Sequence, residues 1–241
     1  MNIALLGYGK MGKAIEEIAL QRGHTIVCAV SIDNLEDLTA ENIKKADVAI
    51  EFTGPDSAFD NIKLAIDTGV PVVSGSTGWL KRYEEISQYC MEKKGALLYA
   101  SNFSVGVNIF FSINKKLAEL MASHPDYDVE MREIHHTQKL DAPSGTAIAL
   151  AEQVLERVNR KNKWVNEPAK NSQELSVISE RTDPSPGTHA IRYHSAIDDI
   201  EIIHTAHNRK GFATGAVLAA EFLRGKTGIY TMNDVLGIDP N

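Results

Sequence analysis

The chain has little that would mark a secreted, membrane or nucleic-acid-binding protein. It has only two cysteines, Cys28 and Cys90, without CxxC spacing, so we expect buried free thiols and no disulfide framework. No apolar run reaches the roughly 18 residues of a membrane helix. Its 25 basic and 32 acidic residues give a net charge of −7, which argues against a nucleic-acid partner. The N-terminus lacks the pattern of a signal peptide, so we expect a cytoplasmic protein.

The first hundred residues have the alternation of an α/β protein. Short apolar runs predict strands at residues 3–6, 26–30, 48–52, 70–73 and 96–99. Amphipathic stretches between them predict helices at residues 11–22, 58–68 and 81–93. Residues 33–46 fit either a short helix or a loop. Strand–helix–strand order predicts a parallel sheet covered by helices on both faces.

The pattern changes after residue 102, where strands begin to follow one another without helices between them. We expect helices at 105–122 and 145–160, loops at 161–172 and 182–187, and strands at 129–135, 175–179, 190–195 and 200–206. Consecutive strands predict an antiparallel or mixed sheet. A last helix is expected at 213–224. We therefore expect a nucleotide-binding domain of residues 1–103 and 212–241, with an inserted α+β domain of residues 104–211.

A glycine-rich loop follows the first expected strand and opens the first expected helix. Its residues match G-x-G-x-x-G and are Gly7, Tyr8, Gly9, Lys10, Met11 and Gly12. The first glycine permits a tight turn, the second lets backbone N–H groups approach a pyrophosphate, and the third permits close helix packing. The helix N-terminus adds partial positive charge. The context predicts a dinucleotide site, and therefore NADH, NADPH or both as the cofactor.

Three further segments follow strands of this domain and are expected beside the cofactor. Asp33 follows the second strand, where a carboxylate binds ribose hydroxyls and disfavours a 2′-phosphate. Lys10 could still attract that phosphate, and an ordinary turn aspartate is the alternative. The other two segments lie beyond the fourth and fifth strands, where ordinary βα turns are the alternative. Their residues are Gly75, Ser76 and Thr77, and Ala100, Ser101, Asn102 and Phe103.

The segment from residue 135 to 146 concentrates the groups that proton transfer and anion binding require. His135 and His136 end a strand, Lys139 follows, and Ser144 is a fair helix cap before Gly145 and Thr146. An exposed helix N-terminus beside a lysine and histidines makes a carboxylate site. Reduction of an imine-like or conjugated double bond needs hydride at carbon and a proton from a positioned acid. A solvated loop with a capped helix is the alternative.

No metal is required by this chemistry. Adjacent residues of an extended chain point to opposite faces, so His135 and His136 should have different roles rather than share one ion. His204 and His207, near the end of the last expected strand, are interpreted as structural or interfacial residues.

The same segment, HHTQKLDAPSGTA, closely resembles the signature of the dihydrodipicolinate reductase family. The resemblance extends over nearly the whole chain, through the glycine loop, Glu51-Phe52-Thr53, residues 75–78 and 102–107, and His204-Thr205-Ala206-His207-Asn208-Arg209. It implies a Rossmann-type cofactor domain, an inserted substrate-binding and tetramerisation domain, a homotetramer, and a place in lysine and diaminopimelate biosynthesis. Ser76, Ser101, Glu51 and Lys10 depart mildly from the common family pattern, and Asn34 stands where NADP-competent members often carry Arg.

Carried over by position, the resemblance implies His135 as the proton donor and Lys139 as its partner. His136, Gly145 and Thr146, with the cap Ser144, would hold the carboxylates of a small dicarboxylate substrate. The glycine loop, Asp33 and the two later segments would contact the cofactor. Two alternatives remain open: another NAD(P)-dependent oxidoreductase of amino or hydroxy acids, and a non-enzymatic dinucleotide sensor. The sensor would need an output module, and none is visible in the sequence.

Overall fold

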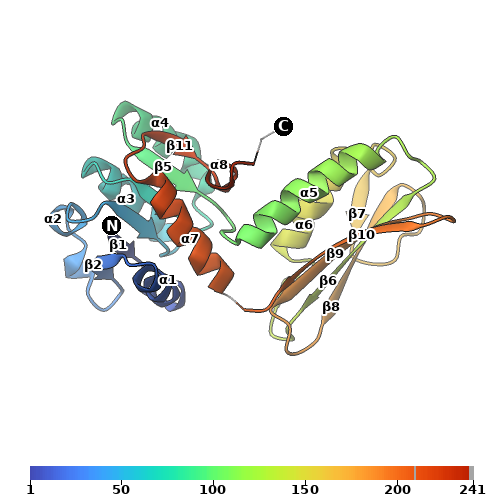
Figure 1. The fold of residues 1–241 in the computed structure, drawn as a ribbon, viewed down its shortest axis with the longest axis horizontal. Helices are drawn as coiled ribbons and strands as arrows, with labels where there is room; N and C mark the ends of the chain where they lie inside the picture. Colours follow the sequence, from blue (N-terminus) through green and yellow to red (C-terminus); the bar gives the residue numbers. More distant parts are fainter. Residues whose placement is uncertain (209, 239–241) are drawn as a thin grey trace. The chain divides into compact units, whose positions relative to one another are not determined.

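The chain folds into two compact units. The computed structural model describes residues 1–208 and 210–238; unit 1 comprises Met1–Asn108 and Lys210–Asn241, and unit 2 comprises Ile109–Arg209 (Figure 1). The first boundary between the units falls inside helix α5 (Val105–Met121). Next to it, the Asn108 side chain donates hydrogen bonds to the backbone carbonyls of Asn102 and Ser104. Arg209, the last residue of the late family-like stretch, lies outside the described residues. Within the described chain, no helix is long and apolar enough to span a membrane.

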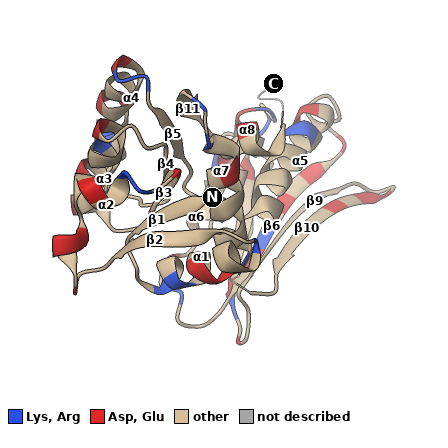
Figure 2. Ribbon diagram, turned by 60° about the vertical axis from the view of Figure 1, so that its left-hand side comes forward, with Lys and Arg blue, Asp and Glu red and all other residues tan. Residues whose placement is uncertain are grey.

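Unit 1 contains a six-stranded, fully parallel sheet, sheet A. Its order is β11 (Gly228–Tyr230), β5 (Ala96–Tyr99), β4 (Val72–Ser74), β3 (Val48–Glu51), β1 (Asn2–Leu6) and β2 (Thr25–Val30). Apart from Glu51 these strands carry no charged residue, which is typical of strands buried on both faces (Figure 2). The five predicted strands are present. The edge strand β11 was not predicted.

Helices cover both faces of sheet A. On one face lie α1 (Lys10–Gln21), α7 (Lys210–Leu223) and α8 (Met232–Leu236), and on the other lie α2 (Ala40–Ile43), α3 (Pro55–Asp67) and α4 (Tyr83–Glu92). Alternate residues of β1 serve the two cores, Ile3 and Leu5 on the first face and Ala4 and Leu6 on the second. The stretch whose structure the sequence left open contains a 3-10 turn, η1 (Leu35–Asp37), and α2; another 3-10 turn, η2 (Leu80–Arg82), precedes α4.

Unit 2 contains the mixed five-stranded sheet B. Its order is β10 (Asp199–Ala206), β9 (Gly187–His194), β6 (Asp128–His135), β8 (Glu174–Arg181) and β7 (Lys163–Val165). The first two pairings are antiparallel and the other two are parallel. The strand β7 lies in a segment that we expected to be a loop, and helix α6 (Gly145–Leu155) is shorter than expected. α5 and α6 pack on one face of sheet B, over a core that includes Phe110, Met131, Leu150 and Tyr193.

Candidate active site

The glycine loop of unit 1 is a tight turn in which only glycine fits at positions 7 and 12. A Cβ at Gly7 would lie 2.2 Å from the carbonyl oxygen of Phe52, and Gly7 has a φ of 105°. A Cβ at Gly12 would lie 2.3 Å from the carbonyl oxygen of Gly7. Gly9 is the N-cap of α1, has open space where a Cβ would stand, and no side chain caps this helix. The helix N-terminus can therefore receive an anion directly on its backbone.

A pocket of about 560 Å³ opens beside this loop, at the carboxyl ends of β1, β2 and β3. The residues expected to contact the cofactor that line this pocket are Gly7, Tyr8, Gly9 and Asp33. Ile32, Thr53 and Asn61 also line it and were not predicted. Lys10, Met11 and Gly12 do not line this pocket; they form the first turn of α1.

Asn34, beside Asp33, is held by its own turn. Its side chain accepts hydrogen bonds from the backbone N–H and hydroxyl of Ser31 at 2.7 and 2.9 Å. It also donates to the carbonyl of Ala29 at 3.0 Å and to Asp37 at 2.8 Å. Asp33 has an exposed side chain at the pocket. The turn therefore presents the carboxylate of Asp33, and not a cation, to the pocket.

The loop at 75–77 is organised by the buried carboxylate of Glu51. Glu51 is 0% exposed and accepts hydrogen bonds from the hydroxyls of Ser74 at 2.6 Å, Ser76 at 2.7 Å and Thr53 at 2.5 Å, and from the Thr53 backbone at 2.8 Å. A Cβ at Gly75 would lie 2.2 Å from the Phe52 ring. Thr77 is exposed, whereas the Ser76 hydroxyl is committed to Glu51.

The segment at 100–103 follows β5 and turns into α5. Ser101 is exposed, and Ala100 and Asn102 are half-buried. Phe103 is 2% exposed and packs against Phe52, with ring centroids 5.5 Å apart. Its side chain is therefore a core residue, and only its backbone is left for contact with a ligand.

In unit 2 the segment from His135 to Thr146 runs from the end of β6 to the start of α6. His135 is buried, His136 and Lys139 are half-buried, and Nζ of Lys139 binds both oxygens of Asp141 at 2.8 and 2.9 Å. Lys139 holds the pKa of Asp141 below its usual value through this ion pair. The Lys139–Asp141 ion pair therefore lies within the same segment as His135 and His136.

The first turn of α6 is capped and open at the same time. The Ser144 hydroxyl accepts from the backbone N–H of Ala147 at 3.2 Å, as an N-cap does. Gly145 is exposed, Thr146 is half-buried, and nothing lies within 4 Å of a Cβ at Gly145. The N-terminus of α6 can thus accept a carboxylate next to two histidines and a lysine.

The centre of the unit 2 cluster is Glu133, a residue that we did not single out from the sequence. It is 0% exposed, and its Oε1 accepts from the Ser179 hydroxyl at 2.7 Å and from the Ser144 backbone at 3.0 Å. Its Oε2 faces Nδ1 of His135 at 3.3 Å and Nε2 of His189 at 3.6 Å. Burial alone raises the pKa of the Glu133 carboxyl, but the nearby imidazoles of His135 and His189 and the hydrogen bonds from Ser144 and Ser179 together hold that pKa far below its usual range.

The sequence does contain a signal for Glu133. The inward-facing positions of β6 are Val129, Met131, Glu133 and His135, and all four are buried. A glutamate at a position where the alternation calls for an apolar residue indicates a paired, functional carboxylate. His189 also stands at an inward-facing position of its strand, with Ile191 and Tyr193, but its contact with Glu133 depends on the pairing of β9 with β6.

Glu133, His135 and His189 offer three ligand atoms within 4.8 Å of one another, a set that could hold a metal ion. The same distances fit an ion-pair cluster, in which imidazole N–H groups face a carboxylate. His136 does not belong to this set. His204 is half-buried beside Phe110, and burial lowers its pKa, as expected of a structural histidine; His207 is exposed.

Comparisons with known proteins decide the family. The family model "Dihydrodipicolinate reductase, N-terminus" matches residues 1–103, and "Dihydrodipicolinate reductase, C-terminus" matches residues 106–236. The chain belongs to the dihydrodipicolinate reductase family. The family expected from the signature segment is thereby confirmed, and the chain is an oxidoreductase of that family.

Relatives of known name agree over the full length. The chain is 50% identical over 236 residues to the 4-hydroxy-tetrahydrodipicolinate reductase of Christiangramia forsetii, covering 98% of both chains. It is 34% identical over 241 residues to the enzyme of the same name from Methanosarcina acetivorans, covering 98% of this chain and 89% of that one.

Solved structures agree on the fold. A dipicolinate-bound dihydrodipicolinate reductase from Paenisporosarcina sp. TG-14 matches with a TM-score of 0.78 at 23% identity, over 97% of this chain and 98% of that one. An engineered D-amino acid dehydrogenase bound to NADP+ matches with a TM-score of 0.53 at 14% identity, over 100% of this chain and 96% of that one. The expected α/β architecture, a Rossmann-type parallel sheet with a second α+β unit, is confirmed.

Proposed function

We propose that this chain converts 4-hydroxy-tetrahydrodipicolinate to tetrahydrodipicolinate, a step of lysine and diaminopimelate biosynthesis in which the 4-hydroxyl group leaves as water and the resulting double bond takes up one hydride and one proton. The observation that carries the proposal is the His135–Glu133 pair standing beside the open N-terminus of α6, which joins a proton donor to a carboxylate site. Bound in the pocket of unit 1, a nicotinamide dinucleotide supplies hydride. The two buried free thiols, Cys28 and Cys90, fit an enzyme of the reducing cytoplasm.

Each group of the unit 2 segment has a role in this proposal. Nε2 of His135 delivers the proton that the atom next to the reduced carbon requires. Lys139 supplies an ammonium beside the reacting atoms. His136, the N–H of Gly145 and the hydroxyl of Thr146 bind the substrate carboxylates, and Ser144 fixes the helix end at which they bind. The dipicolinate named for the Paenisporosarcina structure is a planar dicarboxylate, the class of ligand that these residues are proposed to bind.

The unit 1 pocket favours NADH over NADPH. Its described lining contains the carboxylates of Asp33 and Asp56 and has no lysine or arginine. A ribose 2′-phosphate would meet negative charge there, whereas a 2′-hydroxyl can donate to Asp33. We expect kcat/KM to be higher with NADH than with NADPH. The substitution Asp33→Asn should lower the ratio of kcat/KM with NADH to kcat/KM with NADPH by about tenfold, which corresponds to 1.4 kcal/mol.

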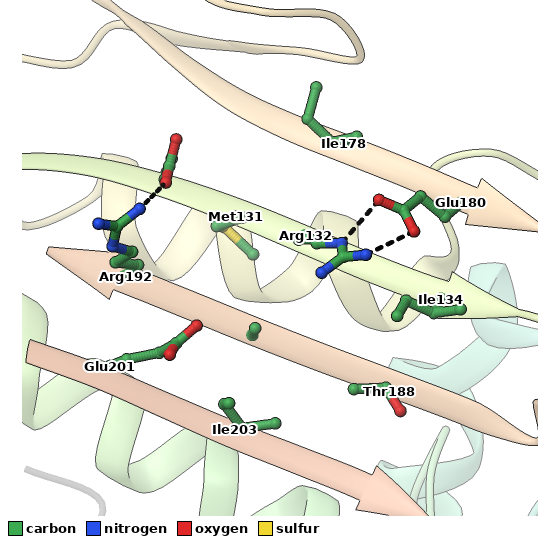
Figure 3. Close-up of a pocket in the computed structure, with 11 residues that line it drawn as sticks. Met131, Arg132, Ile134, Ile178, Glu180, Thr188, Arg192, Glu201 and Ile203 are labelled. Carbon is green, nitrogen blue, oxygen red and sulfur yellow. Dashed lines mark hydrogen bonds and ion pairs between the residues drawn. The ribbon is translucent and has the colours of Figure 1, made fainter.

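We also propose a homotetramer in which the open face of sheet B is one of the contacts between copies of the chain. This face bears a hollow of about 420 Å³ lined by Ile134, Ile178 and Ile203, flanked by ion-paired Arg132–Glu180 and Arg192–Glu130 (Figure 3). Ile203 is 57% exposed. Apolar side chains set among charges of both signs suit a second copy of the same surface. Ile203→Glu should shift the mass measured by light scattering toward smaller species, and an unchanged mass would refute this contact.

The activity is tested directly with freshly prepared condensation product of pyruvate and aspartate semialdehyde. NADH absorbance should fall on addition of the protein and depend on the concentration of the condensation product. Parallel assays with NADPH measure cofactor preference. If neither cofactor is oxidised, the proposed function is wrong.

A further inference from the structure

The two oxygens of Glu133 have different surroundings. Oε1 has conventional donors, since it accepts from Ser179 and Ser144 and lies 3.5 Å from Nη2 of Arg181. Oε2 is buried and lacks such a donor among the residues that the structure describes; of these, the imidazoles of His135 and His189 approach it. Nδ1 of His135 is likewise buried, with no other partner in the described part of the chain. These two buried atoms lie 3.3 Å apart, so a proton on Nδ1 would give each of them the partner that a buried polar atom needs.

We propose that Glu133 is a positioning residue for the reaction, which holds a proton on Nδ1 of His135 so that Nε2 is the nitrogen that acts on substrate. The inference rests on the proposed function for its kinetic consequence, but the location of the proton can be measured without turnover. The carboxylate stabilises the imidazolium before transfer and the Nδ1–H tautomer after it. In the step itself, the Nε2–H bond breaks and the proton passes to the atom beside the reduced carbon.

The surroundings of Nε2 support this assignment. A Cβ at Gly187 would stand 3.0 Å from Nε2, and Gly187 has a φ of 151°. Glycine at this position therefore leaves the nitrogen unobstructed by a side chain. The other nitrogen, Nδ1, points into the cluster. Nδ1 of His135 therefore faces Glu133, and Nε2 is the nitrogen that we assign to the substrate.

His189 limits the freedom of Glu133. Its Nε2 lies 3.6 Å from Oε2 and 3.2 Å from the Ser144 hydroxyl, and its ring stands edge-on to that of His135 with centroids 5.1 Å apart. The same glutamate therefore ties together the acid on β6, a histidine on β9 and the first turn of α6, where we place the substrate carboxylates. A shift of Glu133 would displace both parts of the site.

Charged groups from each neighbouring element bear on the pH dependence. His135 lies on the same strand as Glu133, His189 faces it from β9, Arg181 from β8, and the Lys139–Asp141 pair lies in the loop before α6. Arg181 also donates to the carbonyls of Lys139 and Asp141 at 3.2 and 2.5 Å. Glu133→Gln removes one negative charge and leaves these other groups in place.

The kinetic test compares kcat against pH for the wild type, Glu133→Gln and Glu119→Gln. Glu119 is an exposed residue of α5, paired with Lys116, and serves as the matched control. Glu133→Gln should lower kcat at pH 7 by about tenfold or more, and should move the alkaline fall of kcat to lower pH by about one unit. Glu119→Gln should follow the wild type. An alkaline fall at the wild-type pH in folded Glu133→Gln would overturn the proposal.

A second measurement uses the wild-type protein alone and does not depend on turnover. In ¹⁵N-labelled wild-type protein, neutral His135 should carry its proton on Nδ1, observed by nitrogen shifts and one-bond couplings. A proton on Nε2 of neutral His135 would overturn the proposal even if the enzyme is fully active. An inactive wild type with the proton on Nδ1 would instead refute the proposed function and leave the role of Glu133 supported.

Discussion

Glu51 in unit 1 and Glu133 in unit 2 are both completely buried, and both lie in central strands of their sheets, yet their partners differ in kind. Glu51 accepts from three hydroxyls and one backbone N–H, none of which titrates near neutral pH. Glu133 also faces two imidazoles and a guanidinium. The first arrangement fixes the loops at 53 and 74–76, whereas the second couples a fixed charge to groups that exchange protons.

The donors around a buried carboxylate, and not its burial, indicate its role. Both residues meet the requirement that a buried polar group be hydrogen-bonded, so burial alone does not distinguish them. The identity of the donors does. Substitutions around Glu133 should therefore change turnover and its pH dependence, and substitutions around Glu51 should change cofactor binding.

The largest effect is expected from His135→Gln, which removes the titratable partner of Glu133. Turnover should fall by about 10² to 10⁴-fold, the contribution of a positioned acid, while KM for the substrate changes much less. Steady-state kinetics at saturating NADH measure both quantities. If His135→Gln keeps the wild-type kcat and only binds the substrate more weakly, His135 is not the proton donor.

Gly187→Ala should give the next largest effect. The new methyl group would press on Nε2 of His135 at about 3 Å, so we expect kcat to fall by roughly tenfold. Gly23→Ala in unit 1 is the control, because Gly23 also has a positive φ, of 79°, but has no neighbour within 4 Å. Both variants should lose stability through backbone strain, about 1 kcal/mol or more. Equal kcat in the two variants would contradict the proposal that Nε2 of His135 acts on substrate and needs the space beside Gly187.

Thr146→Val tests the substrate end of the unit 2 site. Loss of one hydroxyl donor to a carboxylate should raise KM about tenfold, corresponding to roughly 1.5 kcal/mol, with little change in kcat. Affinity for dipicolinate, measured by calorimetry, should weaken in parallel. A fall in kcat at constant KM would place Thr146 in the chemical step instead.

The smallest effect concerns acid stability. The folded-state pKa of Glu133 is lowered, so its stabilisation is fully present above its ordinary value, about 4.5, and is lost as the pH falls toward the folded value. The wild type should therefore lose more stability than Glu133→Gln between pH 6 and pH 3, measured by urea unfolding. Parallel curves for the two proteins would show that Glu133 titrates alike in the folded and unfolded chain.

The sequence predicted the parts that depend on local pattern. The five main strands of sheet A, the glycine loop and the cap at Ser144 follow from periodicity and turn chemistry. β7 (KWV) and β11 (GIY) have three residues each and lack the apolar run Val70-Pro71-Val72-Val73 that predicted the equally short β4. The Glu133–His189 contact joins residues 56 positions apart through the register of β6 against β9, which no local pattern encodes. The family resemblance pointed to residues 135–146 as the candidate catalytic segment but gave no role to Glu133 or His189.

The most direct test of the contrast between the two glutamates is a paired kinetic measurement on Glu51→Gln and Glu133→Gln. For each, KM for NADH and the pH of the alkaline fall in kcat are measured in one assay. We predict that Glu51→Gln raises KM for NADH several-fold, with the alkaline fall at the wild-type pH, because it loosens only the loops. Glu133→Gln should move the alkaline fall to lower pH at an unchanged KM for NADH. If both substitutions change the same parameter, the two carboxylates do not differ as their partners indicate.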